Sequence, residues 1–86
     1  MSDAEYIADI DVSELVRKYK KHVFIIDHMA ATLTPRQRQW HIAAARGYRK
    51  LCALVFYETG DEEMATLVTG APHWLTFTDD QVAHIA

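Results

Sequence analysis

Apolar residues between Val12 and Leu33 recur in alternating steps of four and three positions. The stripe comprises Val12, Val16, Tyr19, Val23, Ile26, Ala30 and Leu33. Such spacing is typical of an α-helix that packs along a second helix lying nearly parallel to it. Asp11 or Ser13 can cap the first turn, so the pattern predicts a long helix that begins after one of these residues and ends near Ala31.

A second long helix is predicted between Thr34 and Gly60. Thr34 can serve as the N-cap, Pro35 suits the first helical position, where its missing N–H costs nothing, and Gln37 completes a capping box. Gly60 readily adopts the left-handed conformation that follows a last helical turn. The predicted helix has about 24 residues and is therefore about 36 Å long, at 1.5 Å per residue.

The inward face of this second helix is expected to follow one stripe of helical spacing. Its members are Trp40, Ala44, Gly47, Leu51, Leu54 and Val55. Gly47 would let a neighbouring backbone approach closely. From Leu51 to Tyr57 the helix is apolar in every direction, and such a helix is normally covered on all sides. We therefore expect this helix to be central, with more than one neighbour.

Only residues 31–34 connect the two long helices, and short helix–helix connections produce antiparallel neighbours. Capping residues indicate further short helices over residues 3–9, 62–69 and 79–85. The sequence thus predicts an all-α protein, built on an antiparallel hairpin of two long helices with short flanking helices at both ends.

Residues 71–77 lack a helical period and are interrupted by Pro72. They are expected to form a loop that folds Trp74, Leu75 and Phe77 over the hairpin. A helix-turn-helix that starts at Glu63 is the alternative for this region. It is disfavoured because the following segment carries a proline and two acids, which suit the major groove poorly.

The length of 86 residues predicts a single helical domain, residues 1–86, with a core near the lower limit for independent stability. Self-association would bury more surface, and we expect a homo-oligomer. The expected interface consists of apolar residues that lie off the packing stripes: Phe24, Ile25, Phe56 and Tyr57. No apolar run is long enough to span a bilayer and the acidic N-terminus does not resemble a signal peptide, which predicts a cytoplasmic protein.

The formal net charge of −3 conceals a strong segregation of charge along the chain. All nine basic residues lie between Arg17 and Lys50, where Asp27 is the only acid, and the other eleven acids flank this region. In a hairpin that turns near residues 33 and 34, positions whose numbers sum to about 67 lie side by side. Basic residues from the two helices are then expected to merge into one patch.

The predicted anion- or partner-binding residues are this patch, two arginines in the first turns of the second helix, and one interleaved tyrosine. They are Arg17, Lys20, Lys21, Arg36, Arg38, Arg46, Tyr48, Arg49 and Lys50. Two interpretations remain open. The cations converge to meet phosphates or an acidic protein surface, or they are solvated faces over which the acidic ends of the chain fold. Trp40 is interpreted as a core residue, and Tyr48 suits packing or stacking on a base.

No nucleotide-binding loop, zinc-ligand spacing or nucleophile motif occurs in the sequence, so we expect no enzyme, no cofactor and no metal site. Cys52 lies within an apolar run and is interpreted as a buried hydrophobic residue rather than a reactive thiol. His22, His28 and His41 have no partner at ligand spacing.

Two functions are compatible with these features. The first is a non-enzymatic binding protein that acts by stoichiometric contact with a partner protein, as an inhibitor, adaptor or regulator. The second is an anion-binding protein that holds nucleic acid or a small nucleotide on the basic patch. Chains of this size are often accessory proteins of phages or mobile elements, which is an expectation from length alone.

Overall fold

The computed structural model describes residues 10–85 of the chain. Its elements are helix α2 (Val12–Met29), the 3₁₀-turn η1 (Ala30–Thr32), helix α3 (Pro35–Thr59), helix α4 (Glu62–Thr69), the 3₁₀-turn η2 (His73–Thr76) and helix α5 (Asp79–Ala83). Every regular element within this range is helical, which confirms the all-α class. The helix predicted over residues 3–9 lies outside the described residues.

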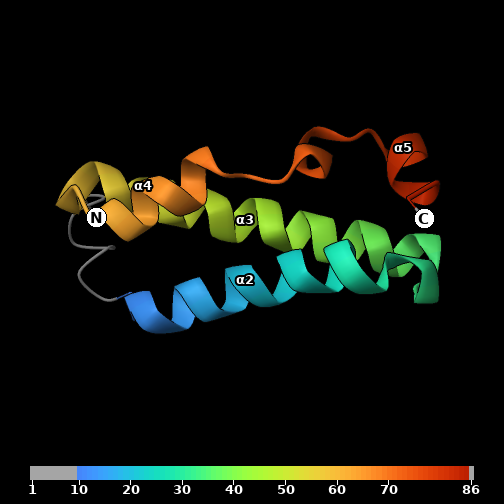
Figure 1. The fold of residues 1–86 in the computed structure, drawn as a ribbon, viewed down its shortest axis with the longest axis horizontal. Coiled ribbons are helices and arrows are strands. Elements are labelled where there is room, and N and C mark those ends of the chain that lie inside the picture. Colours follow the sequence, from blue (N-terminus) through green and yellow to red (C-terminus); the bar gives the residue numbers. More distant parts are fainter. Residues whose placement is uncertain (1–9, 86) are drawn as a thin grey trace.

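Helix α3 lies at the centre of the molecule. Along α2 the chain runs from left to right in Figure 1, and along α3 it returns. The segment from α4 to α5 then runs along α3 on the side away from α2 in this view. Accordingly, α3 contacts α2, α4, η2 and α5, so the expectation that this helix has more than one neighbour is met.

Capping side chains begin the four described α-helices, and at α4 the cap is Asp61, which accepts a hydrogen bond from the backbone N–H of Met64 at 3.1 Å. Asp11 accepts a hydrogen bond from the backbone N–H of Glu14 at 3.1 Å. Thr34 forms a capping box at the start of α3, and Thr78 forms another at the start of α5. Gly60 ends α3 with a φ of 68°, a left-handed conformation that favours glycine. These boundaries follow from local hydrogen bonding.

The buried face of α3 differs from the predicted one. Its buried residues are Ile42, Ala45, Cys52 and Val55, so of the predicted stripe only Val55 is fully buried. Trp40 is 62 % exposed, and nothing lies within 4 Å of where a side chain at Gly47 would begin. The prediction that Trp40 is a core residue and that Gly47 admits a close backbone approach is wrong. Because α3 carries neighbours along more than one side, its apolar residues do not identify a single inward stripe.

The segment predicted to be a loop contains one helical turn. Residues His73–Thr76 form η2, which is too short to display a periodic pattern in the sequence. Trp74 and Leu75 are 2 % and 7 % exposed and belong to the core, as expected for a segment that folds over the hairpin. The indole Nε1–H of Trp74 donates to Asp27 Oδ1 at 2.7 Å, which ties η2 to α2.

Candidate functional site

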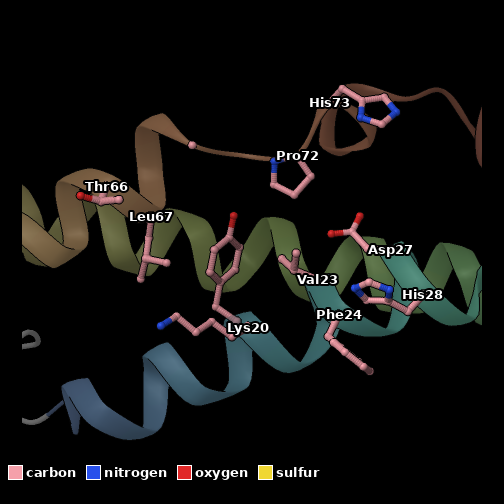
Figure 2. A pocket seen from close by; sticks show the side chains of 11 residues that line it. Lys20, Val23, Phe24, Asp27, His28, Thr66, Leu67, Pro72 and His73 are labelled. Atoms are coloured by element: carbon pink, nitrogen blue, oxygen red, sulfur yellow. The ribbon is translucent and has the colours of Figure 1, made fainter.

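A groove of about 590 Å³ lies between α2 on one side and α4 with the following segment on the other. Its lining residues are Tyr19, Lys20, Val23, Phe24, Asp27, His28, Thr66, Leu67, Gly70, Pro72 and His73. Figure 2 shows Lys20 near Leu67 at one end of the groove, and Asp27 and His28 toward the end where His73 lies. Both walls pack on α3, and the space left between them forms the groove.

Two side-chain contacts join α2 to the C-terminal segment near the groove. Near one end, Lys20 Nζ lies 3.9 Å from Glu63 Oε1 of α4. This is an exposed pair, which contributes little to stability. Near the other end, the Trp74–Asp27 hydrogen bond joins a buried indole to α2. The second contact is therefore the firmer link between α2 and the C-terminal wall.

Apolar side chains form much of the groove wall. Val23 comes from α2, while Leu67 and Pro72 come from the opposite wall, and all three are half-buried. Phe24, also on the lining, is 57 % exposed. A concave surface with apolar walls and a few polar groups is the usual form of a binding site.

Tyr19 supplies a buried polar group to the same groove. The residue is only 3 % exposed, and within residues 10–85 its Oη has no hydrogen-bond partner. Burial raises the pKa of the Tyr19 phenol above its ordinary value, against the opposing effect of the Arg49 charge. The phenol therefore stays protonated at neutral pH and is a hydrogen-bond donor. An unsatisfied buried hydroxyl of this kind costs about 1–3 kcal/mol.

Three arginines among the predicted binding residues bind the protein's own backbone. Arg38 donates from Nε to Ala30 O and from Nη1 to Ala83 O, each at 2.7 Å. Arg49 donates from Nη2 to Val68 O at 3.1 Å.

Arg46 is the third of these arginines, and it holds the segment around η2. It donates from Nε to Leu75 O at 2.5 Å and from Nη2 to Phe77 O at 2.6 Å. Most of the carbonyls bound by the three arginines lie in the last turns of short helices, where C=O groups lack helical partners and cations are favoured. Together these side chains fasten η1, α4, η2 and α5 to α3.

The other cations of the predicted patch have different surroundings. Arg17 donates from Nε to Glu14 Oε2 at 3.0 Å on the same helix, and Lys20 approaches Glu63. Lys21, Arg36 and Lys50 are exposed and form no ion pair within the described residues. Binding of an anion by these exposed cations stays a prediction.

A cluster of aromatic rings and imidazoles joins α2 to α3. The Nδ1 atoms of His22 and His41 lie 2.9 Å apart. The His22 ring is nearly parallel to the ring of Tyr48, with centroids 5.6 Å apart, and meets Trp40 edge-on at 5.5 Å. Tyr48, predicted either to pack or to stack on a base, thus lies against a histidine of its own chain.

Burial is the main cause that lowers the pKa values of both His22 and His41. The proximity of His41 and the charge of Lys21 lower the pKa of His22 further, and Lys21 also acts on His41. Two neutral imidazoles can share one hydrogen bond between their Nδ1 atoms. Sequence analysis missed this pair, although the register that places numbers summing to about 67 side by side brings His22 close to residues 41–48.

The residues predicted to form an interface between copies differ in exposure. Tyr57 is 81 % exposed and Phe24 is 57 % exposed, whereas Ile25 and Phe56 are half-buried. Phe24 lies on the groove lining. Cys52 is fully buried, and burial raises the pKa of its thiol, which agrees with the interpretation of this residue as part of the core.

A second, smaller hollow of about 270 Å³ lies at the beginning of α3. It is lined by Thr34, Arg36, Gln37, Trp40 and His41. Trp40, which is 62 % exposed, and the cationic Arg36 both line it. This combination suits a flat anionic molecule, since aromatic faces stack on bases and cations attract phosphates.

Within residues 10–85 no three histidine, cysteine, aspartate or glutamate side chains converge to form a metal site. In the same range no helix combines the length and the apolar character needed to cross a membrane. The chain matches no known family model, and it has no significant match among curated proteins or solved structures.

Proposed function

We propose that this antiparallel helical hairpin is a non-enzymatic binding protein that acts by stoichiometric contact with a partner protein, as an inhibitor, adaptor or regulator. The observation that carries the proposal is the groove between α2 and the C-terminal segment, with its apolar walls and the exposed ring of Phe24. An apolar side chain of a partner would gain free energy by leaving water there.

The way the groove is built favours direct recognition over refolding. Its C-terminal wall is tied to α3 by Arg46 and Arg49 and to α2 by the Trp74–Asp27 hydrogen bond. A preformed site loses little conformational entropy on binding, so more of the contact energy appears as affinity. The protein thus suits a role in which one molecule occupies one partner.

Partner capture with matched variants tests this proposal. Tagged wild-type protein would be compared with Phe24→Glu in the groove and with Val12→Glu, an exposed apolar position elsewhere on α2. A partner that Phe24→Glu alone fails to retain would then be purified and titrated by calorimetry. We expect saturation at one molecule of this protein for each binding site on the partner, with the covalent mass of the partner unchanged. A chemically altered partner, or equal retention by both variants, would contradict the proposal.

The second candidate is binding of nucleic acid or a small nucleotide. It is supported by the hollow at the start of α3, which exposed Trp40 and Arg36 both line, and by Lys21 and Lys50, which form no ion pair within residues 10–85. Fluorescence titration of Trp40 with mixed oligonucleotides and nucleotides tests it. Phosphate binding should weaken steeply from about 0.05 to 0.5 M salt, whereas an apolar interface should not.

Self-association is part of the proposed behaviour. Tyr57 and Phe24 are large exposed apolar side chains that a second copy could cover. Light scattering measures the mass of the purified protein directly. We expect an oligomer that persists at high salt and is reduced in mass by Tyr57→Glu, and a strictly monomeric species would remove this part of the proposal.

A further inference from the structure

Tyr19 lines the groove and carries a buried hydroxyl that has no hydrogen-bond partner within residues 10–85. Tyr19 is 3 % exposed, and its Oη is one of two buried side-chain atoms within residues 10–85 that lack a partner. The other is Arg49 Nε, and the charge of Arg49 acts on the Tyr19 phenol. The Tyr19 hydroxyl can donate and accept, whereas Arg49 Nε can only donate. An acceptor, such as the oxygen of a carbonyl, would satisfy the O–H of Tyr19.

The walls beside this donor are apolar and belong to two segments distant in the sequence. Figure 2 shows Val23 on α2 facing the C-terminal wall, where Leu67 and Pro72 lie. A ligand whose oxygen reaches Tyr19 would place neighbouring atoms between these side chains. Aliphatic groups fit there, because they bury apolar surface on both sides.

The ends of the groove carry groups that can donate hydrogen bonds to a carboxylate. Lys20 stands at one end, and His28 and His73 lie toward the other. Of the acids, Asp27 already accepts the Trp74 indole and Glu63 already faces Lys20. An ammonium group at one end and imidazole N–H groups toward the other are donors suited to carboxylates on both sides of an apolar part.

The length of the groove matches a short stretch of extended chain. Its α2 wall runs from Tyr19 to His28, which corresponds to about 13 Å at 1.5 Å per residue. An extended peptide advances about 3.3 Å per residue, so about four residues fit between the two ends. The groove volume of about 590 Å³ is in the range of sites that bind small ligands and peptide side chains.

We propose that the groove binds an extended segment of the partner protein, in which aliphatic side chains are flanked by acidic residues and a backbone carbonyl accepts a hydrogen bond from Tyr19 Oη. This inference rests on the proposed function, because it names the part of the partner that would be recognised. The aliphatic side chains pack against Val23, Leu67 and Pro72, and the carboxylates lie near Lys20 and the two imidazoles.

The test uses blocked tetrapeptides and a single deleted oxygen atom. The probes are a peptide with two leucines between aspartates and the same peptide with lysines in place of the aspartates. Binding is followed by ¹H–¹⁵N NMR titration of the full chain. We expect the aspartate peptide to shift amide signals of the groove residues and to bind at least tenfold more tightly than the lysine peptide.

Tyr19→Phe removes only the donor, and Tyr57→Phe makes the same change at a site that is 81 % exposed. We expect Tyr19→Phe to weaken binding of the aspartate peptide by about tenfold or more while leaving the melting temperature of the free protein unchanged or higher. Tyr57→Phe should alter neither quantity. An increased melting temperature follows because the variant no longer buries an unsatisfied hydroxyl.

Several results would overturn this inference. They are no binding of the aspartate peptide to the wild type, equal binding by Tyr19→Phe, tighter binding of the lysine peptide, or a lower melting temperature of Tyr19→Phe, which would show that Oη has a partner within the fold. The proposed function fails differently. If peptides bind as expected but no stoichiometric protein partner is retained, the groove specificity stands and the function does not.

Discussion

Replacing Arg46 by methionine should loosen the C-terminal segment from α3. The change keeps the aliphatic part of the side chain and removes both hydrogen bonds, from Nε to Leu75 O and from Nη2 to Phe77 O. Leu75 is buried, so its carbonyl would lose a charged donor in a place that water reaches poorly. Phe77 is only half-buried, and water can replace the second donor there.

The expected loss of stability follows from these two environments. A hydrogen bond to a charged group contributes about 1.5–3 kcal/mol, and one that water can replace contributes nearer to 0.5–1 kcal/mol. Arg46 itself is exposed, so the lower part of the first range applies. The sum is about 2–3 kcal/mol. For a chain of this size, that loss lowers the melting temperature by roughly 10–20 °C.

Circular dichroism and tryptophan fluorescence measure the global and the local effect separately. Trp74 is 2 % exposed and adjoins the freed carbonyl, whereas Trp40 is 62 % exposed. A Trp40→Phe background therefore leaves Trp74 as the only reporter. We expect the emission of Trp74 to shift to longer wavelength in Arg46→Met well below the melting temperature, because the segment around η2 detaches first.

Arg36→Met is the matched control. Arg36 belongs to the same helix, is exposed and forms no ion pair within the described residues. Its charge opposes the helix dipole, so its removal should change stability by no more than about 0.5 kcal/mol. If Arg46→Met melts within about 2 °C of the wild type with unchanged Trp74 emission, the reasoning is refuted.

The role of Arg46 also affects how anion binding should be tested. Arg46→Glu would remove two contacts that hold η2, so loss of oligonucleotide binding in this variant would not demonstrate a phosphate contact. Lys50 is exposed and unpaired within the described residues, and it is the better position for charge reversal. Loss of binding in Lys50→Glu at unchanged stability would support the second candidate function.

Two further predictions concern pH and helix boundaries. Because burial lowers the folded-state pKa values of His22 and His41 below the ordinary 6.5, the unfolded chain binds protons first as the pH falls. The contribution of these two histidines to folding stability is complete above about pH 6.5 and is lost as the pH drops toward the folded-state pKa values. The melting temperature should therefore fall between about pH 7.5 and 5.5. The slope of melting temperature against pH should flatten in a variant that lacks both imidazoles and persist in the control His28→Asn. A melting temperature of the wild type that does not depend on pH would disprove the role of the His22–His41 pair. Gly60→Ala should cost about 1 kcal/mol because φ is 68°, whereas Gly47→Ala in open helix should stabilise by up to about 1 kcal/mol, both measured by denaturant unfolding. The reverse order of the two glycine variants would contradict this account.

Local signals in the sequence determine the boundaries of most described helices. Asp11, Thr34, Asp61 and Thr78 act as caps in the structure; the sequence predicts Thr34 as a cap and Asp11 as one of two candidates. A cap depends on a side chain and a backbone N–H two or three residues away, so no tertiary contact is needed to foresee it. The short turn η2 is not predicted from the sequence, because a single 3₁₀-turn leaves no periodic pattern of apolar residues.

The sequence pattern alone did not predict the surroundings of α3, because this helix packs against several neighbours. Helical spacing places Trp40 and Gly47 on a buried stripe of α3, yet the first is 62 % exposed and the second faces open space. Likewise, Arg38, Arg46 and Arg49 resembled a free basic patch, but they donate to carbonyls eight or more residues away in the chain. Charge along a sequence does not reveal which backbone acceptors lack partners.

By itself, then, the sequence determined the all-α class, the two long helices and the ends of most described elements, because each depends on hydrogen bonds and apolar spacing within a few residues. Only the tertiary structure decided which face of α3 is buried, which cations are engaged and how Tyr19, Asp27 and Leu67 come to line one groove. These features arise where α2 and the C-terminal segment both pack on α3, and contacts between segments so distant in sequence depend on the packing of the whole chain.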